Sequence, residues 1–217
     1  MNYVLMIANG VTMTSAMVCT AYFYKFYWRS SDYRKILISM VLIGLTAIIT
    51  GLQFVFPEIL TALSRNKEAL LDGEWWRMVT PLFVQPHGFW QCVFNGAFML
   101  TFLPVAEKVY GKRLLALYFI PGIVGQAFNY IWGREGGGSS TAIYGVMGAL
   151  LMYVCRHRNE FPRQYFPFAI AGLCGAVALC FVRDGHAPGL LTGALLATMM
   201  PATVTIDMWN SQVEIKS

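Results

Sequence analysis

Four polar side chains lie in otherwise apolar stretches of the chain, where a hydrolytic reaction could use them. Gln91 and Asn95 are four residues apart and therefore share one face of a helix. Ser140 opens a second apolar segment, and His186 opens a third. A histidine can activate a serine hydroxyl as a nucleophile, and side-chain amides can donate hydrogen bonds to an oxyanion. These residue types together indicate acyl-transfer chemistry.

The composition indicates that these groups lie in a membrane protein. Of the 217 residues, 57% are hydrophobic and 12% are charged, whereas a soluble domain has roughly 25% charged residues. Several windows reach the ~20 apolar residues that cross a bilayer. We predict an all-α polytopic membrane protein forming one compact unit. Its seven predicted spans are residues 4–24, 36–56, 89–106, 114–132, 140–155, 166–182 and 187–206.

The distribution of basic residues predicts the orientation of these spans. Most of the 16 Lys and Arg residues follow the first, third and fifth spans or end the chain. Cytoplasmic loops carry such an excess, so the 57–88 loop, the glycine-rich loop before Ser140 and the 183–186 turn are predicted to face outside. The four polar groups then lie ~10 Å or less below the outer surface. The net charge of +5 follows from this topology and does not indicate nucleic-acid binding.

Small residues predict that the serine and histidine helices pack against each other. Tyr144 and Gly148 follow Ser140 at i+4 and i+8, and Gly189 and Gly193 follow the histidine at i+3 and i+7. Glycine on such a stripe lets two helix backbones approach closely in a membrane. Contact between the two stripes, with Gly145 taking part, brings the hydroxyl and the imidazole together. The Tyr144 ring is then placed to stack on the imidazole.

One acid and one further alcohol beside these helix starts have a structural explanation. Asp184 precedes the histidine helix by two residues and is predicted to cap it, and Ser139 is the better cap candidate for the serine helix. No other acid is suited to a triad, so we predict a Ser140–His186 dyad. Its oxyanion donors are predicted to be the two side-chain amides and the unpaired N–H groups at the start of the serine helix.

In combination these residues resemble the rhomboid intramembrane serine proteases. The resemblance covers roughly residues 36–206 and keeps the family's order of motifs, which makes the first span an N-terminal addition to a six-helix core. The matching positions are Gly138, Ser140, Tyr144 and Gly148 for the nucleophile motif, His186, Gly189 and Gly193 for the histidine motif, Trp76-Arg77 for the loop motif, Asn95, and Glu107 with Gly111.

The resemblance implies an intramembrane endopeptidase that cleaves transmembrane or membrane-anchored proteins near the outer membrane face through an acyl-enzyme. Substrates are expected to arrive laterally, between the spans at 89–106 and 166–182. We expect residues 1–35 to form the additional helix and a basic loop, 36–206 the protease core, and 207–217 a cytoplasmic tail. No cofactor is implied, and a prokaryotic plasma membrane is the expected location.

Two departures from the family pattern keep an alternative open. Thr141 replaces the glycine after the serine, and Gln91 replaces a histidine that often precedes the asparagine by four residues; His87 is expected in the loop. A catalytically inactive relative that binds transmembrane helices is therefore the second hypothesis. A small transporter is disfavoured because most spans lack Asp, Glu, Lys and Arg. The five cysteines form no Cys-x-x-Cys or Cys/His cluster, so no metal site is predicted.

Overall fold

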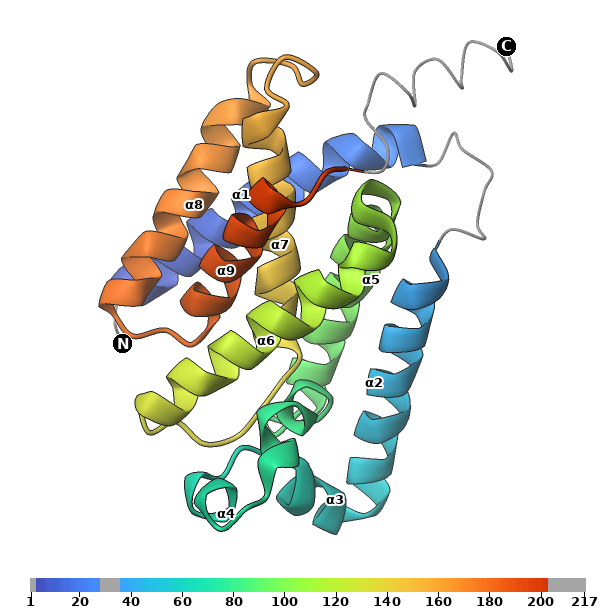
Figure 1. The fold of residues 1–217 in the computed structure, drawn as a ribbon, viewed down its shortest axis with the longest axis vertical. Coiled ribbons are helices and arrows are strands. Elements are labelled where there is room, and N and C mark those ends of the chain that lie inside the picture. Colours follow the sequence, from blue (N-terminus) through green and yellow to red (C-terminus); the bar gives the residue numbers. More distant parts are fainter. Residues whose placement is uncertain (1–2, 28–35, 203–217) are drawn as a thin grey trace.

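The computed structural model describes residues 3–27 and 36–202, and every regular element within these ranges is a helix (Figure 1). The predicted all-α membrane architecture is confirmed. The 3-10 turns Trp75–Met78, Thr80–Leu82 and Gly111–Arg113 accompany the α-helices. The α-helices are α1 (Tyr3–Tyr27), α2 (Leu37–Val55), α3 (Pro57–Leu63), α4 (Lys67–Leu71), α5 (Phe89–Tyr110), α6 (Leu114–Ile131), α7 (Ser140–Arg156), α8 (Tyr165–Phe181) and α9 (His186–Met199).

The apolar helices lie where the spans were predicted, but not all of them are long enough to cross a membrane by length alone. Within the described residues, three stretches are long and apolar enough to cross a membrane: Tyr3–Tyr24, Leu37–Val55 and Phe89–Ile131, the last of which contains both α5 and α6. Helices α7 and α8 are shorter apolar helices.

The predicted span at 187–206 is wrong at its C-terminal end. Helix α9 stops at Met199, because Met200 adopts an extended conformation and Pro201 follows it. The helix therefore does not continue unbroken to residue 206. The predicted tail at 207–217, and most of the basic loop that ends the predicted 1–35 segment, lie outside the described residues.

Helix α7 lies at the centre of the bundle, with α5, α6, α8 and α9 around it (Figure 1). Its side chains are buried along most of its length, as Ile143, Leu150 and Val154 illustrate at 0% exposure. A central helix exchanges lipid contacts for close packing between helices, which favours the small residues it carries. The residue at its first position is therefore held by neighbours on several sides.

Helix α2 is attached to this bundle by Glu107 near the end of α5. The carboxylate accepts from the backbone N–H groups of Ile38 and Ser39 at 2.9 and 2.7 Å, and from the Ser39 hydroxyl at 2.6 Å. The first N–H groups of a helix have no partner within the helix, so Glu107 serves as the missing cap. Gly111 then ends α5 with φ +59°, a left-handed conformation that favours glycine.

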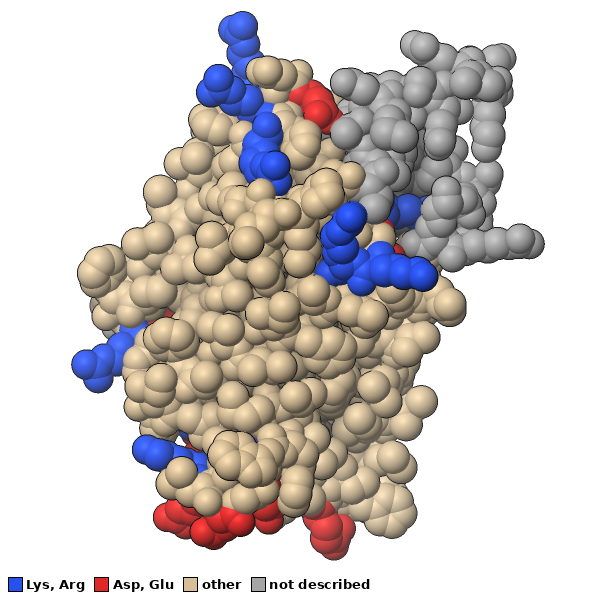
Figure 2. Space-filling model, in the orientation of Figure 1, with Lys and Arg blue, Asp and Glu red and all other residues tan. Residues whose placement is uncertain are grey.

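The segment at 57–88 folds into α3, α4 and two 3-10 turns. Asp and Glu gather at the end of the molecule that these helices form, whereas most of the visible Lys and Arg lie toward the opposite end (Figure 2). The first turns of both short helices contribute acids, Glu58 and Glu68. The bundle therefore has two chemically distinct ends.

Candidate active site

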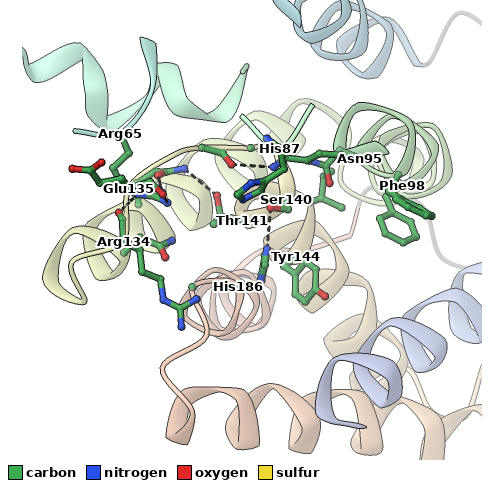
Figure 3. A pocket seen from close by; sticks show the side chains of 18 of the residues that line it. Arg65, His87, Asn95, Phe98, Arg134, Glu135, Ser140, Thr141, Tyr144 and His186 are labelled. Carbon is green, nitrogen blue, oxygen red and sulfur yellow. Dashed lines mark hydrogen bonds between the residues drawn. The ribbon is translucent and has the colours of Figure 1, made fainter. Parts of the chain in front are cut away.

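The hydroxyl of Ser140 and the imidazole of His186 are within hydrogen-bond distance. Ser140 Oγ lies 3.0 Å from His186 Nε2 (Figure 3). Each residue is the first of its helix, α7 and α9 respectively, although the two are 46 positions apart. This distance is within the range that proton transfer from a serine to a general base requires.

Asp184 completes a chain of hydrogen bonds from the other side of the imidazole. Its Oδ1 atom lies 2.7 Å from His186 Nδ1 and also accepts the backbone N–H of His186 at 2.9 Å. The predicted capping contact is therefore present, and the same oxygen also bonds the imidazole, a contact that the prediction of a dyad did not include. Sequence reasoning missed this because the separation of two residues suggested only the cap.

The ionisation of Asp184 fixes the tautomer of the histidine. Burial by itself raises the pKa of this carboxyl, but the hydrogen bonds and charge of His186 outweigh burial, and the pKa is lowered overall. A carboxylate only accepts hydrogen bonds, so Nδ1 of a neutral imidazole must carry the hydrogen. Nε2 is then free to accept from the serine hydroxyl.

Tyr144 holds the plane of the imidazole. Its ring centroid lies 4.6 Å from that of His186, with an angle of 32° between the planes. The tyrosine hydroxyl donates to Oδ1 of Asn9 in α1 at 2.8 Å. The spacing of four residues from Ser140 indicated the ring contact, but nothing in the sequence indicated the contact with α1.

Glycines bring α7 and α9 close enough for the serine and histidine to meet. A Cβ atom placed on Gly193 would contact the carbonyl oxygen of Gly145, and one on Gly148 would contact that of Leu190. On Gly189 it would lie 2.5 Å from the carbonyl oxygen of Thr141. The two backbones therefore touch directly along the predicted stripes.

The amides of Gln91 and Asn95 converge on Gly138, two residues before the serine. A Cβ atom on Gly138 would contact Nε2 of Gln91 and lie 3.5 Å from Nδ2 of Asn95. Gly138 has φ +137°, a conformation that side-chain-bearing residues rarely adopt. Gln91 donates to the Gly137 carbonyl at 3.0 Å and accepts from the His87 backbone N–H at 2.8 Å. Both amides therefore face the loop that delivers the serine.

Gln85 is a buried residue of this region that sequence reasoning missed. Its Oε1 accepts from Asn95 Nδ2 at 2.7 Å, and its Nε2 donates to Ser139 Oγ at 3.3 Å. Its backbone N–H and carbonyl are both bonded by the Gln53 side chain, each at 2.9 Å. A loop residue has no helical period that shows which way its side chain points, so no signal in the sequence marked Gln85.

Ser139 makes no side-chain cap of α7, contrary to the prediction.

Comparison with known proteins identifies the family to which this arrangement belongs. The rhomboid domain model matches residues 72–203, which is more than half of the chain. The chain belongs to the rhomboid family. It is an integral membrane protein.

Curated relatives of the chain include rhomboids from bacteria and a protozoan. The chain is 31% identical over 135 residues to the putative rhomboid protease YdcA of Bacillus subtilis, covering 58% of this chain and 67% of that protein. It is 29% identical over 151 residues to the rhomboid protease GluP of the same organism, covering 66% of this chain but 30% of GluP. Rhomboid-like protease 2 of Toxoplasma gondii is 27% identical over 155 residues, covering 63% of this chain and 52% of that protein. The chain therefore spans about half or less of the last two relatives.

The Trp-Arg motif of this rhomboid holds the loop together. Arg77 is 6% exposed; its guanidinium donates to the carbonyl oxygens of Thr61 and Ser64 at 2.9 and 2.6 Å and pairs with Glu74 at 2.6 Å. Trp76, by contrast, is 52% exposed. The arginine therefore joins α3 to the following 3-10 turn, while the tryptophan lies at the surface, where aromatic belts meet the headgroup region.

Thr141, which departs from the rhomboid pattern, has a matching space on α6. A Cβ atom on Gly125 would lie 2.9 Å from Thr141 Cβ, so this glycine makes room for the threonine. The threonine hydroxyl accepts from Gln126 Nε2 at 3.3 Å, and Gln126 Oε1 in turn accepts from Arg65. Burial lowers the pKa of Arg65 to about 10, which leaves the guanidinium charged at neutral pH.

A cavity of about 530 Å³ lies beside the reacting groups, and Ser140 and His186 both line it (Figure 3). Its wall combines charged groups from the loops with amide and apolar side chains from the helices. Among the described residues, no group of three or more His, Cys, Asp and Glu side chains could hold a metal ion. The further lining residues include Met13, Arg65, His87, Phe94, Phe98, Gln126 and Arg134.

Proposed function

We propose that the protein is an intramembrane serine endopeptidase with Ser140 as nucleophile and His186 as general base. The observation that carries the proposal is the 3.0 Å contact between Ser140 Oγ and His186 Nε2 at the wall of the cavity. The names of the curated relatives, which are called rhomboid proteases, support the same activity.

The geometry supports a two-step reaction. His186 Nε2 takes the hydroxyl proton as Ser140 Oγ attacks the scissile carbonyl, and then returns it to the leaving amine, which gives an acyl-enzyme. A water molecule activated by the same nitrogen hydrolyses the ester and restores the serine. Asp184 holds the imidazole in the required tautomer and stabilises the imidazolium while it exists. The role of the carboxylate makes a triad a better description than the predicted dyad.

The negative oxygen of the tetrahedral intermediate requires hydrogen-bond donors. An amide nitrogen carries two hydrogens, and Gln91 and Asn95 each use one of them, toward Gly137 and Gln85 respectively. The second hydrogen of each remains for an oxyanion above Ser140. The positive end of the α7 dipole and its first N–H groups favour the same charge.

The substrate class that fits the site is a transmembrane or membrane-anchored protein. Ser140 and His186 begin helices that start toward the acidic end of the bundle, and the excess of basic residues elsewhere assigns that end to the outer side. A helical segment hides its carbonyl groups in its own hydrogen bonds, so a substrate must unwind near its outer end before Ser140 can attack. Water reaches the serine through the polar side of the cavity.

The proposal is tested with purified protein, a fluorophosphonate probe and a single-span membrane protein as substrate. We expect Ser140→Ala and His186→Ala each to abolish labelling and cleavage. Ser139→Ala is the matched control: it removes the neighbouring hydroxyl, which lies against Gln85 rather than His186, and should retain both activities. Cleavage that survives Ser140→Ala, or binding of the substrate without turnover in the unaltered protein, would reject the proposal in favour of another nucleophile or of an inactive relative.

A further inference from the structure

Helix α1 lies between α5 and α8, the two helices between which substrates were predicted to arrive (Figure 3). Its Thr12 hydroxyl donates to the Gly172 carbonyl of α8 at 3.3 Å. Its Tyr24 hydroxyl donates to the Thr101 carbonyl of α5 at 2.7 Å. The lateral face of the bundle beside the active site is therefore occupied by a helix outside the region that the rhomboid domain model matches.

This helix also reaches the reacting groups. Met13 is part of the wall of the cavity that holds Ser140 and His186. One turn earlier, Asn9 accepts the hydroxyl of Tyr144, whose ring stacks on the imidazole. Any transmembrane segment that approaches Ser140 from this side must pass beside α1.

The contact of α1 with α8 is continuous and close. Between Ala8 and Thr20 the buried side chains of α1 are small, and two glycines of α8, Gly172 and Gly175, face them. A Cβ atom on Gly172 would lie 3.0 Å from Cβ of Ser15, and one on Gly175 would contact the Thr12 hydroxyl and lie 3.1 Å from the Ala8 carbonyl. Two helices packed through such residues in a membrane are held by extensive van der Waals contact, so they are expected to move together.

The contact of α1 with α5 is different in kind. Near the end of α1 that is far from Ser140, Tyr24 joins the two helices through its bond to Thr101. Closer to Ser140 the cavity separates them, with Met13 on one side and Phe94 and Phe98 on the other. Phe94 is 59% exposed, so this wall is apolar and accessible from the lateral face. An apolar transmembrane segment is the partner that such walls fit.

From these contacts we infer that the substrate's transmembrane segment reaches Ser140 between α1 and α5. Helices α1 and α8 move as one unit, which swings away from α5 about the Tyr24–Thr101 contact. The inference rests on the proposed protease function and replaces the predicted route between α5 and α8. It assigns to α1 one wall of the substrate site, with Met13 as the side chain nearest the incoming segment.

Two cysteine pairs separate the possible routes, in a full-length background whose five native cysteines are replaced. Met13→Cys with Phe98→Cys bridges α1 to α5 across the cavity. Tyr22→Cys with Tyr165→Cys is the matched control and bridges α1 to α8, because the two rings lie 4.7 Å apart and their removal leaves room for a linker. Each pair is closed with a short bis-methanethiosulfonate reagent and released with a reductant, so that each variant serves as its own reference.

We expect the α1–α5 bridge to lower cleavage of a single-span protein at least about tenfold, and reduction to restore it. Fluorophosphonate labelling of Ser140 should persist, because a small probe needs no helix movement. The α1–α8 bridge should leave cleavage within about twofold. The inference would be overturned by full cleavage with the α1–α5 bridge closed, or by loss of cleavage with the α1–α8 bridge closed. In either case, continued labelling of Ser140 would leave the protease proposal standing. Absence of labelling and cleavage in the reduced proteins would instead reject the protease function, and this route with it.

Discussion

One carboxylate oxygen of Asp184 accepts both the backbone N–H and the ring Nδ1 hydrogen of His186. The first bond caps the start of α9, and the second orients the imidazole toward Ser140. Because one atom makes both contacts, the geometry of the helix start and the geometry of the reacting ring are fixed together. Asp184 therefore both caps α9 and orients the imidazole that reacts with Ser140.

Replacing Asp184 by Asn tests whether the acid takes part in catalysis. Asparagine remains a good helix cap, so the fold should be retained, but the negative charge that stabilises the imidazolium is lost. We expect kcat to fall about 10- to 1,000-fold, the range that a nearby opposite charge contributes through pKa shifts of one to three units. The measurement is kcat with a single-span substrate, and a value within about twofold of the unaltered protein would restore the dyad.

The lowered pKa of Asp184 also predicts how stability depends on pH. In the unfolded chain the carboxyl titrates near its ordinary value of 3.8, whereas in the folded protein it remains ionised at lower pH. Its contribution to stability is therefore complete above that ordinary value and is lost as the pH falls through the folded pKa. Thermal unfolding in detergent should show a steeper fall of Tm below about pH 4 than the Asp184→Asn variant shows. Parallel curves would contradict the shift.

The central part of the site could be predicted because membrane helices impose regular spacing. Ser140, Tyr144 and Gly148 lie on one face of α7, and Gly189 and Gly193 lie on the facing side of α9, so period alone indicated which side chains meet. Hydropathy in turn predicted the order of the long helices and roughly their number, because each must satisfy its own backbone hydrogen bonds in lipid.

The parts that could not be predicted depend on loops and on neighbours in space. Gln85 and Arg65 lie in the 57–88 region between helices, where no period relates a residue to the direction of its side chain. Hydropathy showed that α1 is apolar but not which helices it contacts, so its place between α5 and α8 and the bond from Tyr144 to Asn9 had no sequence signal. Asp184 was misjudged because its cap role was sufficient to explain its position.

The contact between α7 and α9 predicts that a single methyl group added between these helices lowers the stability of the protein. In Gly193→Ala, the new methyl group would meet the carbonyl oxygen of Gly145, so the two backbones must separate. We expect a loss of about 1–3 kcal/mol in stability and a large fall in activity, since the Ser140–His186 distance depends on this contact. Gly44→Ala in α2 is the control, because no atom lies within 4 Å of the added group. Equal Tm values for the two variants in detergent would show that the close approach is not needed.

Gln85 is expected to matter for both folding and catalysis. In Gln85→Leu, Asn95 Nδ2 loses its acceptor and Ser139 Oγ loses its donor, while the backbone contacts with Gln53 can remain. Leaving a buried polar group unsatisfied costs about 1–3 kcal/mol. We expect a lower Tm and a kcat that falls more than KM changes, because Asn95 is no longer held in place. Gln85→Glu keeps an acceptor for Asn95 and should recover part of kcat; if Gln85→Leu has unaltered kinetics, the network has no part in the reaction.

The loop before the nucleophile gives a direct test of the amide donors, because two of its glycines share a left-handed backbone but differ in their surroundings. Gly138 has φ +137° and Gly133 has φ +65°. A Cβ atom on Gly138 would contact the Gln91 amide, whereas one on Gly133 would have no atom within 4 Å. Both Gly→Ala variants carry a backbone cost of about 1–3 kcal/mol, and Gly138→Ala adds the overlap with Gln91, so its Tm should fall further. Only Gly138→Ala displaces the oxyanion donors, and its kcat should fall about 100-fold, in line with the loss of one such donor. Equal kcat values in the two variants would mean that Gln91 and Asn95 do not stabilise the intermediate, and the α7 backbone N–H groups would then be the remaining donors.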